Sequence, residues 1–176
     1  MRSFTLCLGL AFASLTSIGA RAETPIPTRN PVGESTKFKR QPPQTWVALG
    51  LREAQRIARA MAIVRTAPYR EHFAAISAAL SHAEVVWKET GDYPACGAKT
   101  MAYVLGREPR IHLCAIVMRH PDFGVDALAQ TLIHEGAHLA GFRRECDATK
   151  LEIAAVRFVT DGLAYRNAYM PGCGLR

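Results

Sequence analysis

The sequence predicts an α+β fold that is mainly helical, with a small β-hairpin beside one of the helices. Two patterns support this class. Apolar residues recur at helical spacing in four segments between residues 46 and 159. Two short runs rich in aromatic and β-branched residues lie on either side of a Gly/Pro turn at residues 106–109. The chain has no internal repeat, so we expect one domain with a single core.

The first 22 residues have the features of a secretory signal peptide. A basic start precedes an apolar stretch from Phe4 to about Leu15, and Ala20 and Ala22 are small residues that suit cleavage. We therefore expect a mature chain that begins near Glu23 and is periplasmic or secreted, without a stable membrane span. An uncleaved membrane anchor is the alternative.

Residues 23–45 contain five prolines among basic residues, which predicts an extended lead-in. The folded domain is then expected over residues 46–176. The formal charge of the full chain is +7, and it falls to +5 when Arg2 and Arg21 leave with the signal peptide. This balance suits an approach to anionic envelope surfaces or acidic substrates. No motif supports a nucleic-acid partner.

Removal of the signal peptide takes away Cys7 and leaves four cysteines, Cys96, Cys114, Cys146 and Cys173. An even number in an exported chain predicts two disulfides. Of the three pairings, we favour Cys96 with Cys114, because both flank the predicted hairpin, and this leaves Cys146 for Cys173. A Cys-rich zinc site is disfavoured, since no C-x-x-C pair occurs.

Two helices are predicted at the start of the domain. The first runs from Trp46 to Thr66, and the second begins at Pro68 and ends before Gly91. The apolar side of the second helix is predicted to hold Phe73, Ile76, Ala79, Leu80, Ala83, Val86 and Trp87. The two histidines of this helix, His72 and His82, are ten residues apart and are interpreted as surface or edge residues.

The β-hairpin is expected from residues 101–105 and 110–117, around the turn at 106–109. His112 on its second strand could face a cleft, but a structural role is the preferred interpretation. An edge strand of this kind can align a substrate backbone by strand addition.

A third helix is predicted from about Val125 to Leu139. Asp126 in its first turn favours the helix dipole, and Gly141 ends it. A final helix is predicted from about Arg144 to Val159.

The third helix contains the H-E-x-x-H motif His134-Glu135-Gly136-Ala137-His138. Histidines four residues apart lie on one face of a helix, so both imidazoles can bind one metal ion while the glutamate stays beside it. This pattern is typical of zinc hydrolases. We therefore expect Zn2+ bound by His134 and His138, with Glu135 as the general base that takes a proton from water and passes it to a leaving amine.

A catalytic zinc keeps three protein ligands, so the third is expected after the turn at Gly141. Glu145 lies seven residues past His138 and shares its helical face with small and polar residues. Asp147 lies nine residues past His138 and shares its face with apolar residues that must pack inward. These patterns favour Glu145 over Asp147 but leave both open.

The motif and its surroundings resemble the aspzincins, the deuterolysin-like metallopeptidases. That resemblance rests on H-E-x-x-H followed by a glycine and then by Asp147, and it implies that this aspartate is the third zinc ligand. Residues 96–114 also resemble the disulfide-closed hairpin that precedes the metal helix in that family. In contrast, Glu145-x-x-Ala148 resembles the E-x-x-A signature of glutamate zincins, whose third ligand is the glutamate.

The motif and the resemblance imply an exported, zincin-like metallopeptidase that acts on proteins or on cell-wall peptides. Two alternatives stay open: a catalytically silent zinc-binding envelope protein that binds a partner through its cleft, and an exported toxin. Tyr165 and Tyr169 are candidate donors to the oxyanion of a transition state, although ordinary core or surface positions are the preferred interpretation.

Overall fold

The computed structural model describes residues 43–88, 96, 100–106, 108–119, 123–159 and 170–175. Its elements are α2 (Pro43–Ile63), α3 (Arg70–His82), β1 (Glu84–Lys88), β2 (Ala102–Val104), β3 (Arg110–Cys114), the 3₁₀ helix η1 (Ala115–Arg119), α4 (Val125–Leu139) and α5 (Glu145–Val159). Within these described ranges, four α-helices and a small mixed sheet make an α+β fold, which confirms the predicted class. The predicted signal peptide, the lead-in as far as residue 42, Tyr165 and Tyr169 lie outside the described residues.

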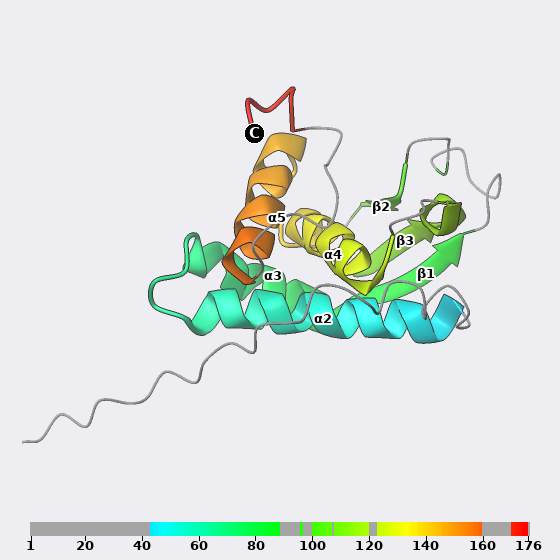
Figure 1. Cartoon of the computed structure of the whole chain (residues 1–176), viewed down its shortest axis with the longest axis horizontal. Coiled ribbons are helices and arrows are strands. Elements are labelled where there is room, and N and C mark those ends of the chain that lie inside the picture. Colours follow the sequence, from blue (N-terminus) through cyan, green and yellow to red (C-terminus); the bar gives the residue numbers. More distant parts are fainter. Residues whose placement is uncertain are drawn as a thin grey trace, which may run out of the picture.

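Helix α4 lies at the centre of the fold, where α2, α3, α5 and strand β2 all contact it (Figure 1). From Val125 to Ala137 every residue of α4 is buried except Asp126. Asp126 stays exposed in the first turn, as predicted. Because neighbours cover α4 on all sides, packing fixes the position of the H-E-x-x-H motif in its second half.

Two glycines allow neighbouring helices to approach α4 closely. A Cβ atom at Gly50 of α2 would overlap the side chain of Leu128 on α4. A Cβ atom at Gly136 of α4 would lie 2.8 Å from Cγ of Leu80 on α3, closer than real side-chain contacts. The glycine inside the motif is therefore required by the packing of α3 on α4.

The three strands form a sheet in the order β1-β3-β2. Strands β2 and β3 pair antiparallel, with Tyr103 opposite His112, and this confirms the predicted hairpin. The predicted extension of its second strand to residue 117 is wrong, because β3 ends at Cys114 and η1 follows. Ile111 and Leu113 of β3 belong to the buried core cluster. Since neighbouring residues of a strand point to opposite faces, His112 points away from that core, where its ring stacks on Tyr103 with centroids 4.8 Å apart. This position favours the structural interpretation of His112.

The prediction of a second helix that extends to Trp87 is wrong. Helix α3 ends at His82, and Glu84–Lys88 forms strand β1, which pairs parallel with β3. Ala83 already has extended backbone angles (φ −72°, ψ 130°). The valines and the tryptophan that follow suit a strand, and the long-range pairing with β3 outweighs the local helical spacing. His72 and His82 are exposed, as predicted.

Both predicted disulfides are present, Cys96–Cys114 and Cys146–Cys173. The first joins residue 96 to the end of β3. The second joins the first turn of α5 to the segment 170–175. Two disulfides fit an extracellular location. Within the described ranges, no helix has the length and apolar character that crossing a bilayer requires.

Candidate metal centre

The two histidines of the motif share one face of α4. The ring of His134 is almost completely buried and that of His138 is partly buried, and their centroids lie 4.8 Å apart. Their Nε2 atoms are 3.1 Å apart. One helix therefore places two nitrogen ligands side by side, as the spacing predicts.

The turn after α4 brings the chain back towards these histidines. Gly141 has a left-handed backbone (φ +99°), which glycine adopts without strain. The N–H of Phe142 donates to the carbonyl of Ala137 at 3.0 Å, and this closes the turn. The ring of His72 on α3 stacks on Phe142 at 5.0 Å. The hydrogen bond to α4 and the stacking on α3 together fix the turn, and α5 therefore begins beside the motif.

The backbone of this turn also orients His138. The carbonyl oxygen of Phe142 accepts a hydrogen bond from Nδ1 of His138 at 2.8 Å. A proton held on Nδ1 leaves Nε2 with its lone pair exposed towards His134. The ligand atom of His138 is therefore Nε2.

Glu145, the first residue of α5, completes a group of three ligand atoms. Its Oε2 atom lies 3.1 Å from Nε2 of His134 and 3.5 Å from Nε2 of His138. One ligand atom from each of the three residues lies within 4.8 Å of the other two. Two helices that are separated by one turn thus bring two nitrogens and one carboxylate oxygen to the same point.

The size of this triangle fits a small divalent cation. Its sides measure 3.1, 3.1 and 3.5 Å, which suits zinc–nitrogen and zinc–oxygen bonds of about 2.0–2.2 Å. Three protein ligands would hold such an ion and leave a coordination position for another group. The donor set of two imidazoles and a carboxylate is also one that divalent transition metals accept. The residues can therefore hold a metal ion.

Asp147, the competing third ligand, is not part of this group. Its carboxylate lies 4.0 Å from Nε of Arg144, and its side chain is 41% exposed. Two residues along α5 from Glu145, it occupies a different face of the helix. The structure thus brings three of the four predicted metal ligands together and directs the fourth towards an arginine.

Glu152 is a site residue that the sequence did not single out. Its side chain is completely buried, and its Oε2 atom accepts a hydrogen bond from Nδ1 of His134 at 2.9 Å. Nε2 of Gln130 donates to the other carboxylate oxygen at 2.6 Å. This pair holds the proton of His134 on Nδ1 and directs Nε2 into the centre. The available signal was the spacing of Glu145 and Glu152, two turns apart on one face of α5.

Thr149 lies between these two glutamates on the same face of α5. Its hydroxyl is buried, and within the described ranges it has no hydrogen-bond partner. A buried hydroxyl without a partner is costly unless water or another group satisfies it.

Glu135 is buried beside the three ligand residues, with only 6% of its surface exposed. Burial raises the pKa of its carboxyl group to about 7, since the charged form loses its hydration. His134 opposes this shift, while the charges of Glu145 and Glu152 add to it. Glu135 can therefore take up and release a proton near neutral pH.

The acidic surroundings also change the titration of His134. Burial lowers the pKa of this imidazole, but the hydrogen bond that it donates to Glu152 and the charges of Glu152, Glu135 and Glu145 outweigh burial, so that the pKa is raised. The centre thus favours a positive charge at the position of His134. A bound cation would supply such a charge.

Comparison with known proteins adds nothing to this geometry, because no protein family, no curated protein and no solved structure matches the chain. Within the described residues, His134, His138 and Glu145 form a candidate metal centre.

Proposed function

We propose that the protein is an exported, zinc-dependent metallopeptidase. One observation carries this proposal: His134, His138 and Glu145 present three ligand atoms to one point, and the buried Glu135 lies beside them. Three protein ligands with an open position are typical of catalytic zinc sites, whereas structural sites use four.

Zinc is favoured by the donors themselves. Two imidazole nitrogens and a carboxylate form the set used by several zinc peptidases. The hydrogen bonds of both Nδ1 atoms, to Glu152 and to the carbonyl of Phe142, are the supports expected for ligating histidines. When bound, such an ion polarises a peptide carbonyl and lowers the pKa of water.

Glu135 has the position and the pKa for proton transfer. It is one residue from His134, and burial raises its pKa to about 7. A carboxylate of this kind accepts the proton of the attacking water and then delivers it to the leaving amine. Hydrolysis of an amide needs both transfers, so loss of this carboxyl group should slow the reaction.

The disulfides Cys96–Cys114 and Cys146–Cys173 support an exported protein, as does the predicted signal peptide. The substrates proposed are therefore peptide bonds outside the cytoplasm, in proteins or in cell-wall peptides.

Metal content measured by elemental analysis tests the centre. We expect about one zinc per chain in the unaltered protein, loss of zinc in Glu145→Ala, and retention in Asp147→Ala. These two variants are matched, because both remove a carboxylate from the first turn of α5. Loss of zinc in neither variant would overturn the three-ligand centre, and loss only in Asp147→Ala would assign the centre to the aspartate.

Glu135→Gln tests catalysis separately. We expect this variant to keep its zinc and to lose hydrolysis of a peptide library by roughly 10²–10⁴-fold. Unchanged hydrolysis would refute the role of Glu135. A protein that holds zinc but hydrolyses nothing would instead be a zinc-binding envelope protein without turnover.

A further inference from the structure

Helix α2 carries a stripe of arginines away from the metal centre. Arg52, Arg56, Arg59 and Ile63 follow at intervals of three and four residues, which places them on one face of the helix. Arg52, Arg59 and Ile63 are exposed. We refer to these four residues as the α2 stripe.

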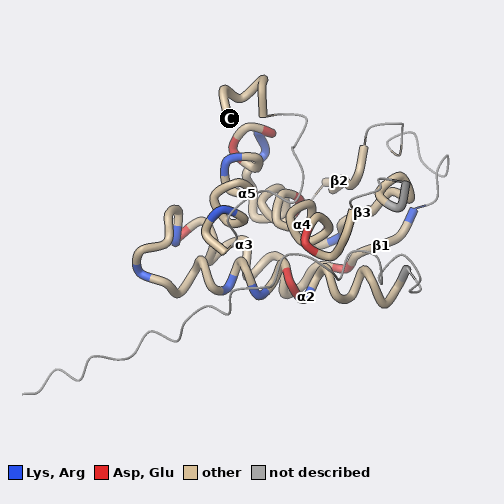
Figure 2. Tube along the Cα trace, viewed as in Figure 1, with Lys and Arg blue, Asp and Glu red and all other residues tan. Residues whose placement is uncertain are grey.

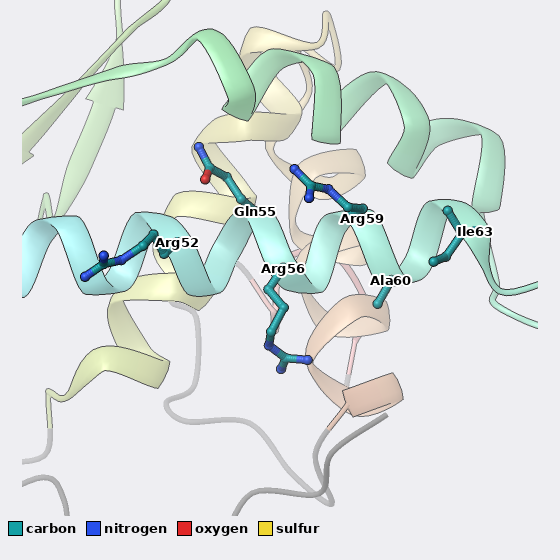
Figure 3. A pocket seen from close by; sticks show the side chains of 6 residues that line it. All are labelled: Arg52, Gln55, Arg56, Arg59, Ala60 and Ile63. Carbon is teal, nitrogen blue, oxygen red and sulfur yellow. The ribbon is translucent and has the colours of Figure 1, made fainter. Parts of the chain in front are cut away.

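The stripe borders a shallow hollow of about 330 Å³. Its lining consists of Arg52, Gln55, Arg56, Arg59, Ala60 and Ile63 (Figure 3). From this face, the side chains of Gln55 and Arg59 are directed towards α3, and that of Arg56 is directed away from α3. The guanidinium groups are therefore spread over the surface and do not converge on one point.

Most of the positive charge of the stripe is not neutralised. Arg56 makes a two-point ion pair with Glu53, at 2.8 and 2.9 Å. Arg52 and Arg59 make no ion pair within the part of the chain that the structure describes. Between Glu53 and Glu71 the sequence contains no acidic residue.

The end of α2 continues this basic surface into the turn that joins α2 to α3. Arg65 in the turn and Arg70 at the start of α3 are exposed. Figure 2 shows basic residues along this part of the chain. Two of the three large apolar side chains that are exposed in the described residues lie at the same turn, Ile63 at 70% and Tyr69 at 51%. Tyr69 also has a left-handed backbone (φ 58°), which L-residues with side chains seldom adopt. Exposed apolar side chains thus border the arginines.

We propose that the α2 stripe and the α2–α3 turn dock the protein onto an anionic phospholipid surface. Arg52 and Arg59 are two helical turns apart, about 10 Å, which is farther than one phosphate group bridges. Many headgroups in a plane match such spread charges, and the acyl boundary accepts Ile63 while a tyrosine suits the interface. The helix would lie along the membrane. None of these residues belongs to the metal centre, so the two proposals fail independently.

Binding to vesicles tests the proposal. The protein would be recovered after export, so that any leader has been processed, and mixed with vesicles of phosphatidylcholine alone or with phosphatidylglycerol added. We expect binding only to the anionic vesicles. Arg52→Gln/Arg59→Gln should weaken this binding about 25-fold at about 0.1 M salt, because each arginine near such a surface contributes roughly a factor of five.

Arg143→Gln/Lys150→Gln is the matched control. It removes the same charge from two exposed positions on the α4–α5 turn and on α5. We expect this control variant to bind within about twofold of the unaltered protein, since salt screens the attraction between the membrane and charges outside the contact. Ile63→Ser should weaken binding severalfold even at high salt, because the apolar contact is not screened.

Three results would overturn the proposal: equal binding to neutral and anionic vesicles, equal losses in the two double variants, or no binding to either vesicle. If the protein instead binds inorganic phosphate with an affinity that falls in Arg52→Gln/Arg59→Gln, the stripe is a site for a soluble anion and the membrane assignment is wrong.

Discussion

Glu152 and His134 form a buried hydrogen bond of 2.9 Å between a carboxylate oxygen and Nδ1, on two helices that also carry the ligand atoms of the centre. Within the core this carboxylate has no access to water, so its orientation depends on His134 and on the amide of Gln130. The bond fixes both the tautomer and the ring orientation of His134. Glu152 therefore orients the metal centre through the histidine.

Replacement of Glu152 should weaken metal binding. We expect Glu152→Leu to reduce zinc affinity by roughly 10–100-fold, since the imidazole loses the group that orients it. Glu152→Gln keeps an oxygen that can accept the bond, so its loss should be smaller. Competition against a coloured chelator measures both affinities, and near-ultraviolet circular dichroism checks that each variant is folded. A folded Glu152→Leu that binds zinc normally would contradict the role.

The metal-free protein should lose stability as the pH rises. The pKa of Glu135 is raised from 4.5 to about 7 in the folded chain, so the folded state holds a proton that the unfolded state releases. The contribution of Glu135 to the free energy of unfolding is complete below about pH 4.5 and is lost by about pH 7. The raised pKa of His134 acts in the same direction, with a loss that begins near its ordinary value of 6.5. Thermal unfolding in the presence of a chelator should give a lower Tm at pH 8 than at pH 5.5.

Glu135→Gln provides the control for this pH dependence. The amide of this variant does not titrate, so the decrease in stability that begins at the lower pH should disappear, while the decrease due to His134 remains. A Tm that rises between pH 5.5 and pH 8 in the unaltered protein would contradict both assignments. Zinc affinity should show the opposite trend and increase with pH, because His134 must lose its proton to bind the ion.

Gly136→Ala should destabilise the fold, because the new methyl group meets Leu80 of α3. Overpacking of this kind costs about 1–3 kcal/mol. In a Leu80→Ala background the space is free, and the same substitution should then stabilise α4 by up to about 1 kcal/mol, the difference in helix propensity. Urea denaturation of the four proteins in this cycle gives both values. The same sign in both backgrounds would show that the close approach of α3 is not the cause.

The disulfide Cys146–Cys173 should support the metal centre more than Cys96–Cys114 does. Cys146 directly follows Glu145, so the bond anchors the turn of α5 that carries the third ligand. Each pair replaced by alanines should cost roughly 3–4 kcal/mol of stability. Zinc affinity, measured under conditions in which both variants are folded, should fall only in Cys146→Ala/Cys173→Ala. Equal losses of affinity would indicate a general effect of stability.

The parts of the fold that depend on local pattern could be predicted from the sequence. The bounds of α4 and α5 follow from apolar spacing, an acidic first turn and the glycine at 141. The hairpin and the two disulfides follow from turn residues and from cysteine positions. Strand β1 could not be predicted, because Val86 and Trp87 fit a helical spacing and their partners on β3 lie about 26 residues away in the chain.

The candidate site was predictable in its first helix and not in its second. The motif alone places His134 and His138 on one face of α4. The choice between Glu145 and Asp147 depends on how the turn at Gly141 sets the rotation of α5, which spacing does not determine. The role of Glu152 could not be predicted either, since a glutamate in an amphipathic helix is usually exposed.

The contact between Gly136 and Leu80 limits which chains can share this architecture. In an H-E-x-x-H motif the two middle positions are usually treated as free. Here the first of them accepts no side chain while a leucine of α3 lies against it, and the second, Ala137, is completely buried. A chain with a large residue at the first position must have moved or lost this crossing helix. The residue between the ligands therefore reports on the arrangement of the helices, independently of the metal.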